Sequence, residues 1–116
     1  MEPDRARQLL QRERERIQAE LSSLRAAHGD GDDELARVDQ HTADAGSELF
    51  ENERDQSMIT RLQQELEAIQ RAEQRVEEGT YGRSVESGEP IPEGRLEAIP
   101  WAERTADEQA RLEAGS

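Results

Sequence analysis

Hydrophobic residues recur in the first part of the chain at alternating spacings of three and four residues. This pattern runs from Asp4 to about Ala27 and consists of Leu10, Ile17, Leu21 and Leu24, with Arg14 at the one polar position. Such spacings place side chains along one stripe of an α-helix, which forms the seam of a coiled coil. Pro3 is tolerated in a first helical turn, since the N–H that proline lacks has no partner there. The pattern predicts a helix over residues 4–27.

The helical pattern is interrupted after residue 27 and then resumes in phase. The stretch from His28 to Gly31 contains two glycines, each of which costs about 1 kcal/mol relative to alanine inside a helix. Leu35 and Val38 continue the same seven-residue count beyond it. We therefore expect a short helix over residues 32–39 on the same face.

A second long pattern of the same kind runs from about Ser47 to Glu78. Its seam consists of Ile59, Leu62, Leu66, Ile69 and Val76, with Glu73 at the polar position. In one antiparallel register four pairs of apolar positions meet, namely Leu24 with Leu62, Leu21 with Leu66, Ile17 with Ile69 and Leu10 with Val76. The same register brings Arg14 opposite Glu73, an ion pair that should fix the alignment although exposed pairs contribute only about 0–1 kcal/mol.

This register makes the chain reverse direction within residues 40–46, which we take as the tip of a hairpin. Residues 1–78 are therefore expected to form an antiparallel coiled-coil hairpin. Asn52 and Asp55 lie on the seam close to the tip, where the packing should be weakest.

Glycine and proline become frequent after residue 78, and this density ends helices and sets turns. Residues 79–116 are expected to form a small second module, whose candidate core consists of Tyr81, Val85, Ile91, Leu96, Ile99 and Trp101. Thr105 and Glu108 fit a capping box, which predicts a last helix from about Ala106 to Glu113. The predicted fold is mainly α, with a long helical hairpin followed by a small module that ends in a helix.

Composition limits the functions that this fold could serve. Only 32% of the residues are hydrophobic and 3% aromatic, whereas 37% are charged, which favours an elongated coiled coil over a globule. The net charge of −13 would repel nucleic-acid phosphates but attract a basic protein surface. The chain has no cysteine, so disulfides, thiolate metal sites and thiol catalysis are excluded.

Membrane association and enzyme activity are also disfavoured. No apolar stretch approaches the roughly 20 residues that span a bilayer, and Met1 to Arg7 lack the apolar segment of a signal peptide. We therefore expect a cytoplasmic protein. Phosphate-binding, dinucleotide-binding and nucleophile-elbow motifs are absent, and a slender hairpin offers no desolvated pocket for acid–base chemistry. The chain is predicted not to be an enzyme and to need no cofactor.

Two segments of the sequence resemble one known family. The first covers residues 78–91 and 95–100, reads EGTYGRSVESGEPI and RLEAIP, and is similar to the C-terminal zinc-finger segment of DksA/TraR proteins. The second covers residues 41–55, reads HTADAGSELFENERD, and is similar to the tip and second-helix start of short Gram-positive members. The resemblance implies a bacterial transcription regulator that inserts its coiled coil into the secondary channel of RNA polymerase, and the predicted hairpin is that family's architecture.

The resemblance also identifies four positions at which family members carry zinc-binding cysteines. These positions hold Ser84, Ser87, Thr105 and Glu108. Neutral hydroxyl groups and a single carboxylate do not replace four thiolates around a structural zinc ion. We therefore expect a degenerate, metal-free zinc-finger module, in which the capping box and local serine hydrogen bonds replace the metal.

The residues that act on the partner are expected at the tip. By resemblance Asp44 holds the key acidic position, with Ala45 and Gly46 beside it. Family members usually carry a second acidic residue where this chain has His41, and Asp39 is a candidate substitute. Asp44 could equally serve as the N-cap of the second helix, and His41 could be a solvated loop residue.

Two functions remain open at this point. The first is a monomeric regulator that binds RNA polymerase through its secondary channel, with the acidic tip acting near the active centre. The second is a coiled-coil interaction or scaffold protein that does not engage polymerase. Trp101, the single tryptophan, is expected either to fill the core of the small module or to contact the polymerase rim.

Overall fold

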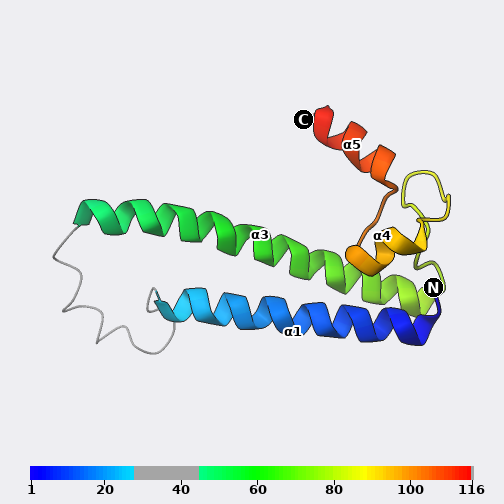
Figure 1. Ribbon diagram of the computed structural model, residues 1–116, viewed down its shortest axis with the longest axis horizontal. Helices are drawn as coiled ribbons and strands as arrows, with labels where there is room; N and C mark the ends of the chain where they lie inside the picture. The colour runs from blue at the N-terminus through cyan, green and yellow to red at the C-terminus, as the bar shows by residue number, and fades with distance from the viewer. Residues whose placement is uncertain (28–44, 116) are drawn as a thin grey trace.

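Two long helices lie side by side and run in opposite directions (Figure 1). The computed structural model describes residues 1–27 and 45–115, and its longest dimension is 54 Å. Helix α1 spans Pro3–Ala27 and helix α3 spans Ala45–Glu78. They begin one and two residues earlier than predicted and end at the predicted residues. The prediction of a mainly α chain built on a helical hairpin is confirmed.

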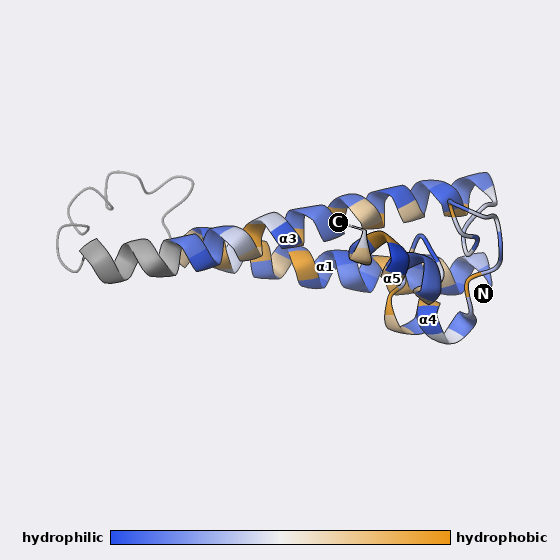
Figure 2. Cartoon of the chain, turned by 90° about the horizontal axis from the view of Figure 1, so that it is seen from above, coloured by the Kyte–Doolittle hydropathy of each residue, from blue (hydrophilic) through white to orange (hydrophobic). Residues whose placement is uncertain are grey.

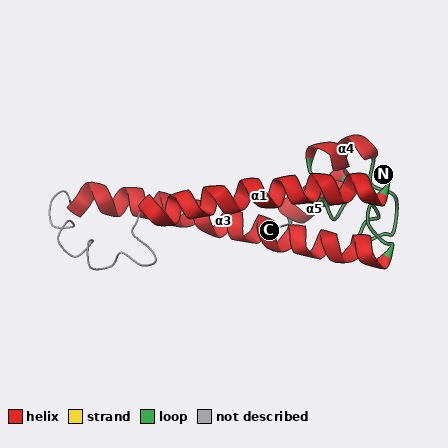
Figure 3. Cartoon of the chain, turned by 90° about the horizontal axis from the view of Figure 1, so that it is seen from below, coloured by secondary structure: helices red, strands yellow, loops and turns green. Residues whose placement is uncertain are grey.

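Two shorter helices follow the hairpin. Helix α4 spans Glu93–Ala98 and lies beside the N-terminal part of α1, while helix α5 spans Ala106–Ala114 (Figure 3). Within residues 1–27 and 45–115 there is no β-strand, and Arg83 and Pro90 form an isolated antiparallel bridge. None of the helices formed by these residues carries an apolar stretch long enough to cross a membrane.

Part of the predicted tip lies outside the described residues. This holds for the short helix over residues 32–39 and for Asp39, His41 and Asp44. Ala45 and Gly46 were predicted to belong to the turn, but they are the first two residues of α3. Alanine has the highest intrinsic helix propensity, which favours the earlier helix start.

The hydrophobic seam forms the core between the two helices. Its buried members are Ala6, Leu10, Ile17 and Leu21 of α1 and Ile59, Leu62, Ile69, Ala72 and Val76 of α3, with Leu24, Met58 and Leu66 partly buried against them. Every apolar residue predicted for the seam within the described residues belongs to this cluster, whereas Leu35 and Val38 lie outside them. Figure 2 shows that the outer surfaces of both helices are largely hydrophilic, as the low hydrophobic content requires.

The polar positions of the two seams meet as predicted, and this confirms the register. Arg14 donates from Nε to Oε2 of Glu73 at 3.3 Å and makes a second hydrogen bond from Nη2 to Oε1. Both side chains are partly shielded, with exposed fractions of 21% and 34%. A second cross-helix pair joins Arg7 to Glu77 at 3.4 Å, so that ion pairs flank the apolar seam toward the base of the hairpin.

Residues 79–115, which we call the C-terminal segment, fold against the base of the hairpin. Helix α3 ends at Glu78, and the next residue, Gly79, has a φ of 81°, which is accessible to glycine at little cost. A second small core consists of Ile91, Leu96 and Ala102, with Tyr81, Ile99 and Met1 packed against it. Tyr81 also contacts the hairpin core and donates from its hydroxyl to the carbonyl of Pro100 at 2.8 Å. Burial raises the pKa of Tyr81 to about 12.

Three details of this segment differ from the sequence prediction. Val85 was expected in the core but is 51% exposed, because its turn directs the backbone N–H inward, to the carbonyl of Glu103 at 2.9 Å. Trp101 packs against the hairpin core and not within the small core of the C-terminal segment. Helix α4 was not predicted, since it is only six residues long and follows Pro92 without a side-chain cap.

Candidate functional site

Four polar residues that are far apart in sequence come together beside the start of α5. Ser84 donates from Oγ to Oε1 of Glu108 at 2.5 Å, and Ser87 lies close enough to help lower the pKa of this carboxyl group. Thr105 donates its backbone N–H to the same Oε1 at 2.9 Å. Ser84 and Glu108 are only 5% and 6% exposed. We call these four residues the polar knot.

Helix α5 begins within the polar knot, which confirms the predicted capping box. The Thr105 hydroxyl accepts the backbone N–H of Glu108 at 3.2 Å, while the Glu108 side chain accepts the backbone N–H of Thr105. Two N–H groups of the first helical turn are thereby satisfied. The carboxylate of Glu108 thus serves two purposes, since it caps α5 and anchors the turn over residues 84–88, which we call the serine turn.

The serine turn is closed by short-range hydrogen bonds. Ser84 Oγ accepts the backbone N–H groups of Glu86 and Ser87 at 3.0 and 3.2 Å. The main chain adds bonds from Ser84 N–H to the Glu89 carbonyl at 2.8 Å and from Gly88 N–H to the Ser84 carbonyl at 2.9 Å. Gly88 has a φ of 77°, a conformation that residues with a Cβ adopt only with strain. The turn therefore depends on both a serine and a glycine.

The electrostatics of the polar knot favour a charged carboxylate. The hydroxyls of Ser84 and Ser87 and the backbone N–H of Thr105 lower the pKa of Glu108 to about 2, because hydrogen bonds to the ionised form stabilise it. The Ser84 hydroxyl and the Thr105 backbone N–H both donate to Oε1 of this carboxylate. Hydrogen bonds from neighbouring groups thus favour the ionised form of this buried carboxyl group.

The polar knot does not fit a structural zinc ion. A tetrahedral structural site requires four ligands such as thiolates and imidazoles, whereas the polar knot offers three hydroxyl groups and one carboxylate. The chain has no cysteine. Among the residues that the structure describes, no three histidine, cysteine or acidic side chains lie close enough to hold a metal ion. The chemistry of this site is structural hydrogen bonding.

Ion pairs join the C-terminal segment to the hairpin around the polar knot. Glu103 bonds Arg71 at 2.7 Å and Arg75 at 3.2 Å, both on α3. Glu97 of α4 pairs with Arg5 of α1 at 3.0 Å. Sequence reasoning missed these contacts, because Glu103 is one of many acidic residues and nothing in its local pattern distinguishes it.

Comparison with known proteins gives these features a context. The family profile described as "Prokaryotic dksA/traR C4-type zinc finger" matches residues 79–114, which include the whole polar knot. The structure of transcription factor DksA2 from Pseudomonas aeruginosa has a TM-score of 0.71 to this fold at 28% identity, covering 97% of this chain and 83% of that chain. The chain belongs to the DksA/TraR family.

Two curated relatives match about two thirds of the chain at the sequence level. General stress protein 16O of Bacillus subtilis (strain 168) is 40% identical over 76 residues, which is 66% of this chain and 47% of that protein. The RNA polymerase-binding transcription factor DksA of Caulobacter vibrioides is 36% identical over 80 residues, or 69% of this chain and 51% of that protein. The chain thus spans about half the length of these relatives.

The DksA/TraR profile is described as a C4-type zinc finger, and this chain departs from that description. It keeps the fold of the segment, while Ser84, Ser87, Thr105 and Glu108 hold the turn and helix α5 together. The residues expected to bind the partner lie at the tip of the hairpin, and the structure describes only two of them. Ala45 and Gly46 open α3, whereas Asp39, His41 and Asp44 lie outside the described residues.

Proposed function

We propose that this protein is a non-enzymatic transcription regulator that binds RNA polymerase through its secondary channel. The observation that carries the proposal is the hairpin of a DksA/TraR protein, together with a relative named as an RNA polymerase-binding transcription factor. Helix α3 has 34 residues, which corresponds to a length of roughly 50 Å. A two-helix rod of this length can carry a few tip residues deep into a narrow channel.

The charge of the protein supports a protein partner rather than DNA. A net charge of −13 opposes binding to nucleic-acid phosphates. The same charge accelerates association with a positively charged protein surface. The protein acts as a monomer in the cytoplasm and contacts polymerase without direct contacts to DNA.

The tip acts near the active centre of polymerase through Asp44, with Ala45 and Gly46 beside it and Asp39 and His41 as neighbours. Sequence similarity over residues 41–55 supports this assignment, as does the start of α3 at Ala45, the residue after Asp44. Asp44 is also in a position to cap α3. The two roles are separable, because asparagine caps a helix about as well as aspartate but carries no charge.

The C-terminal segment keeps its family fold without a metal ion. We assign Ser84, Ser87, Thr105 and Glu108 to the positions where zinc-binding relatives carry cysteines. The hydrogen bonds that converge on Glu108 support this assignment. In this protein the polar knot has the role that zinc has in those relatives, which is to hold the turn and the last helix together.

A binding and transcription assay with purified RNA polymerase tests the proposal. Wild-type protein should bind core polymerase, compete with a ligand that blocks the secondary channel, and change the rate of initiation. Asp44→Asn should abolish the effect on initiation while binding is kept, whereas Asp107→Asn in the first turn of α5 serves as the charge-matched control at the other end of the molecule. Failure of the wild type to bind polymerase at low salt would overturn the proposal and favour a coiled-coil scaffold.

A further inference from the structure

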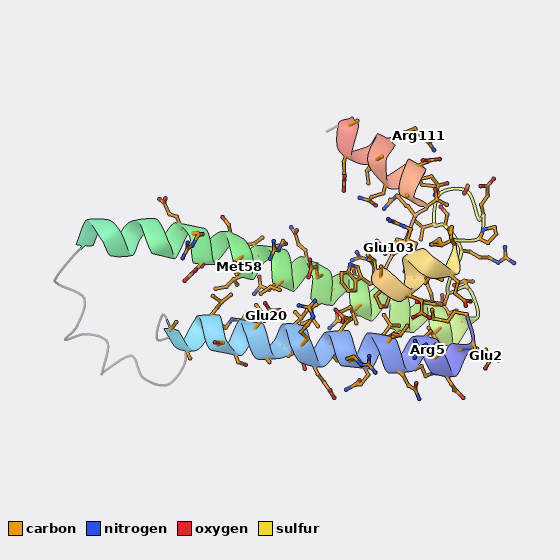
Figure 4. The ribbon with its side chains drawn as sticks, viewed as in Figure 1. Glu2, Arg5, Glu20, Met58, Glu103 and Arg111 are labelled. Carbon is orange, nitrogen blue, oxygen red and sulfur yellow. The ribbon has the colours of Figure 1, made fainter. Side chains whose placement is uncertain are left out.

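Glu103 of the C-terminal segment lies beside helix α3 (Figure 4). Its Oε2 accepts Arg71 Nε at 2.7 Å and Arg75 Nη1 at 3.2 Å, and its Oε1 accepts Arg71 Nη2 at 3.2 Å. The Glu103 side chain is 18% exposed and that of Arg75 is 13% exposed. One partly buried carboxylate is thus held by two arginines one helical turn apart. Two such bonds fix both where the carboxylate lies along α3 and how far it lies from the helix.

The residues next to Glu103 transmit this position to the rest of the C-terminal segment. The Glu103 carbonyl accepts the N–H of Val85, directly after Ser84 in the polar knot, at 2.9 Å. Arg104 binds Glu86 at 2.7 Å through its side chain, and its carbonyl accepts Arg95 Nε at 2.9 Å. Thr105 then starts the cap of α5. The serine turn, α4 and α5 are therefore each bonded to one of residues 103–105, and the first of these residues is the one that contacts α3.

The other contacts between the C-terminal segment and the hairpin restrain the relative orientation of these two parts less tightly. Arg5 and Glu97 are 48% and 43% exposed, so that water and salt screen their attraction. Tyr81 and Trp101 pack on the hairpin core, but apolar contacts are non-directional and tolerate small displacements. The N-terminal ammonium of Met1 pairs with Glu93 of α4 at 3.1 Å, but the Glu93 side chain is 66% exposed. Glu103 makes three hydrogen bonds to α3, so its contact is the most directional of those that join the two parts.

We propose that Glu103 is a positioning residue, which fixes the orientation of the C-terminal segment relative to the hairpin and so presents both ends of the molecule to polymerase in one geometry. The second half of this statement rests on the proposed function. When a protein contacts its partner at two points, the second contact increases the affinity only if both contacts can form at the same time. Loss of the Glu103 carboxylate would leave the contact surface at each end of the molecule intact. The position of one surface relative to the other would then vary.

Distance measurements between spin labels test the positioning directly. Because the chain has no cysteine, labels on Gln63→Cys of α3 and Ala110→Cys of α5, both exposed, report one distance without background. Wild-type Glu103 should give a narrow distribution, and Glu103→Gln should give a broad one. Glu97→Gln, which removes a carboxylate charge from the exposed pair, is the matched control and should leave the distribution narrow.

A second variant and a helicity measurement separate positioning from unfolding. Arg71→Gln removes the strongest partner of Glu103 from a side chain that is 53% exposed, and it should broaden the distribution in the same way. The circular dichroism of both variants should stay that of the wild type, since the hairpin core does not include Glu103. A narrow distribution in Glu103→Gln, or a broad one in the wild type, would overturn the positioning role.

Polymerase binding tests the consequence. Glu103→Gln should raise the Kd for core polymerase by roughly tenfold or more, because the second contact no longer forms at high effective concentration, while Glu97→Gln changes it little. If Glu103→Gln broadens the distances and binding stays unchanged, the link to polymerase is wrong and the proposed function stands. If the wild type itself does not bind polymerase, the proposed function fails, and the distances alone decide whether Glu103 positions the segment.

Discussion

The hairpin and the C-terminal segment are stabilised in different ways. The hairpin buries one continuous apolar seam, in which Leu10, Ile17, Leu62 and Ile69 are almost fully enclosed. The C-terminal segment has three buried apolar residues and otherwise depends on the polar knot and on ion pairs to α3. The comparison shows that a small segment can keep a family fold by directional hydrogen bonds when it has neither a large core nor thiolates for a metal.

The largest expected effect comes from opening the hairpin seam. Ile69→Ala removes a side chain with no exposed surface and should lower the free energy of unfolding by about 3 kcal/mol, since such cavities cost about 2–5 kcal/mol. Denaturant unfolding followed by circular dichroism measures it. Leu112→Ala, at a position that is 46% exposed on α5, should change stability by less than about 1 kcal/mol. Equal effects would mean that the seam is not the dominant core.

A smaller effect is expected from breaking the polar knot. Ser84→Ala removes the donor to Glu108 and the acceptor of two backbone N–H groups, which should cost about 2 kcal/mol because buried polar groups lose their partners. Thermal unfolding followed by Trp101 fluorescence should report the loss in the C-terminal segment. Ser57→Ala on the exposed face of α3 is the matched control, and an unchanged transition in Ser84→Ala would contradict the role of the polar knot.

Acidification should weaken the C-terminal segment before it melts the hairpin. Hydrogen bonds lower the pKa of Glu108 to about 2. Burial raises the pKa of Glu103, but Arg71 and Arg75 outweigh burial and lower it overall. A carboxyl group whose pKa is lower in the folded state stabilises the fold above its unfolded pKa of about 4.5, and this contribution disappears as the pH falls further.

Trp101 fluorescence and circular dichroism, recorded together between pH 7 and pH 2, measure this prediction. The fluorescence should change below about pH 4.5 while the helical signal of the hairpin persists. Coincident transitions at all pH values would show that the two regions respond to acid as one unit.

A still smaller effect is expected from the ion pair that aligns the two helices. A double-mutant cycle with Arg14→Gln and Glu73→Gln should give a coupling energy of about 0.5–1 kcal/mol, because both side chains are partly solvated. Denaturant unfolding of the four proteins provides the cycle. Absence of coupling would show that the pair follows the apolar register without contributing to it.

The smallest expected effect is that of removing metal ions. Treatment with a strong chelator should leave the Tm and the Trp101 fluorescence unchanged, because the hydroxyl groups and carboxylate of the polar knot do not form a structural zinc site. Elemental analysis of the purified protein is the direct check. One equivalent of tightly bound zinc would contradict the account of the C-terminal segment.

The same contrast explains how much could be predicted from the sequence. The hairpin helices, their seam and the Arg14–Glu73 pair follow from a regular period, since one register pairs four apolar positions and the two polar positions at once. The capping box was predictable as well, because its two residues lie within one helical turn. Such features depend on local spacing, and the structure shows them where the spacing indicates.

Features that depend on the path of a loop could not be predicted in this way. Hydrophobicity suggested that Val85 would be buried, but the turn directs its N–H inward and leaves the side chain exposed. Trp101 could be recognised as an apolar anchor, yet its contact with the hairpin depends on how the C-terminal segment folds back. The convergence of Ser84 and Glu103 with distant partners likewise arises only in three dimensions.

Photo-crosslinking from the tip tests the central claim most directly. A photoreactive amino acid placed at position 45, the first residue of α3, leaves Asp44 intact and samples whatever the tip approaches. In the presence of RNA polymerase holoenzyme, the account predicts crosslinks that map to the walls of the secondary channel and that vanish when the channel is blocked. Crosslinks confined to the outer surface of polymerase, or to a second copy of this protein, would contradict it.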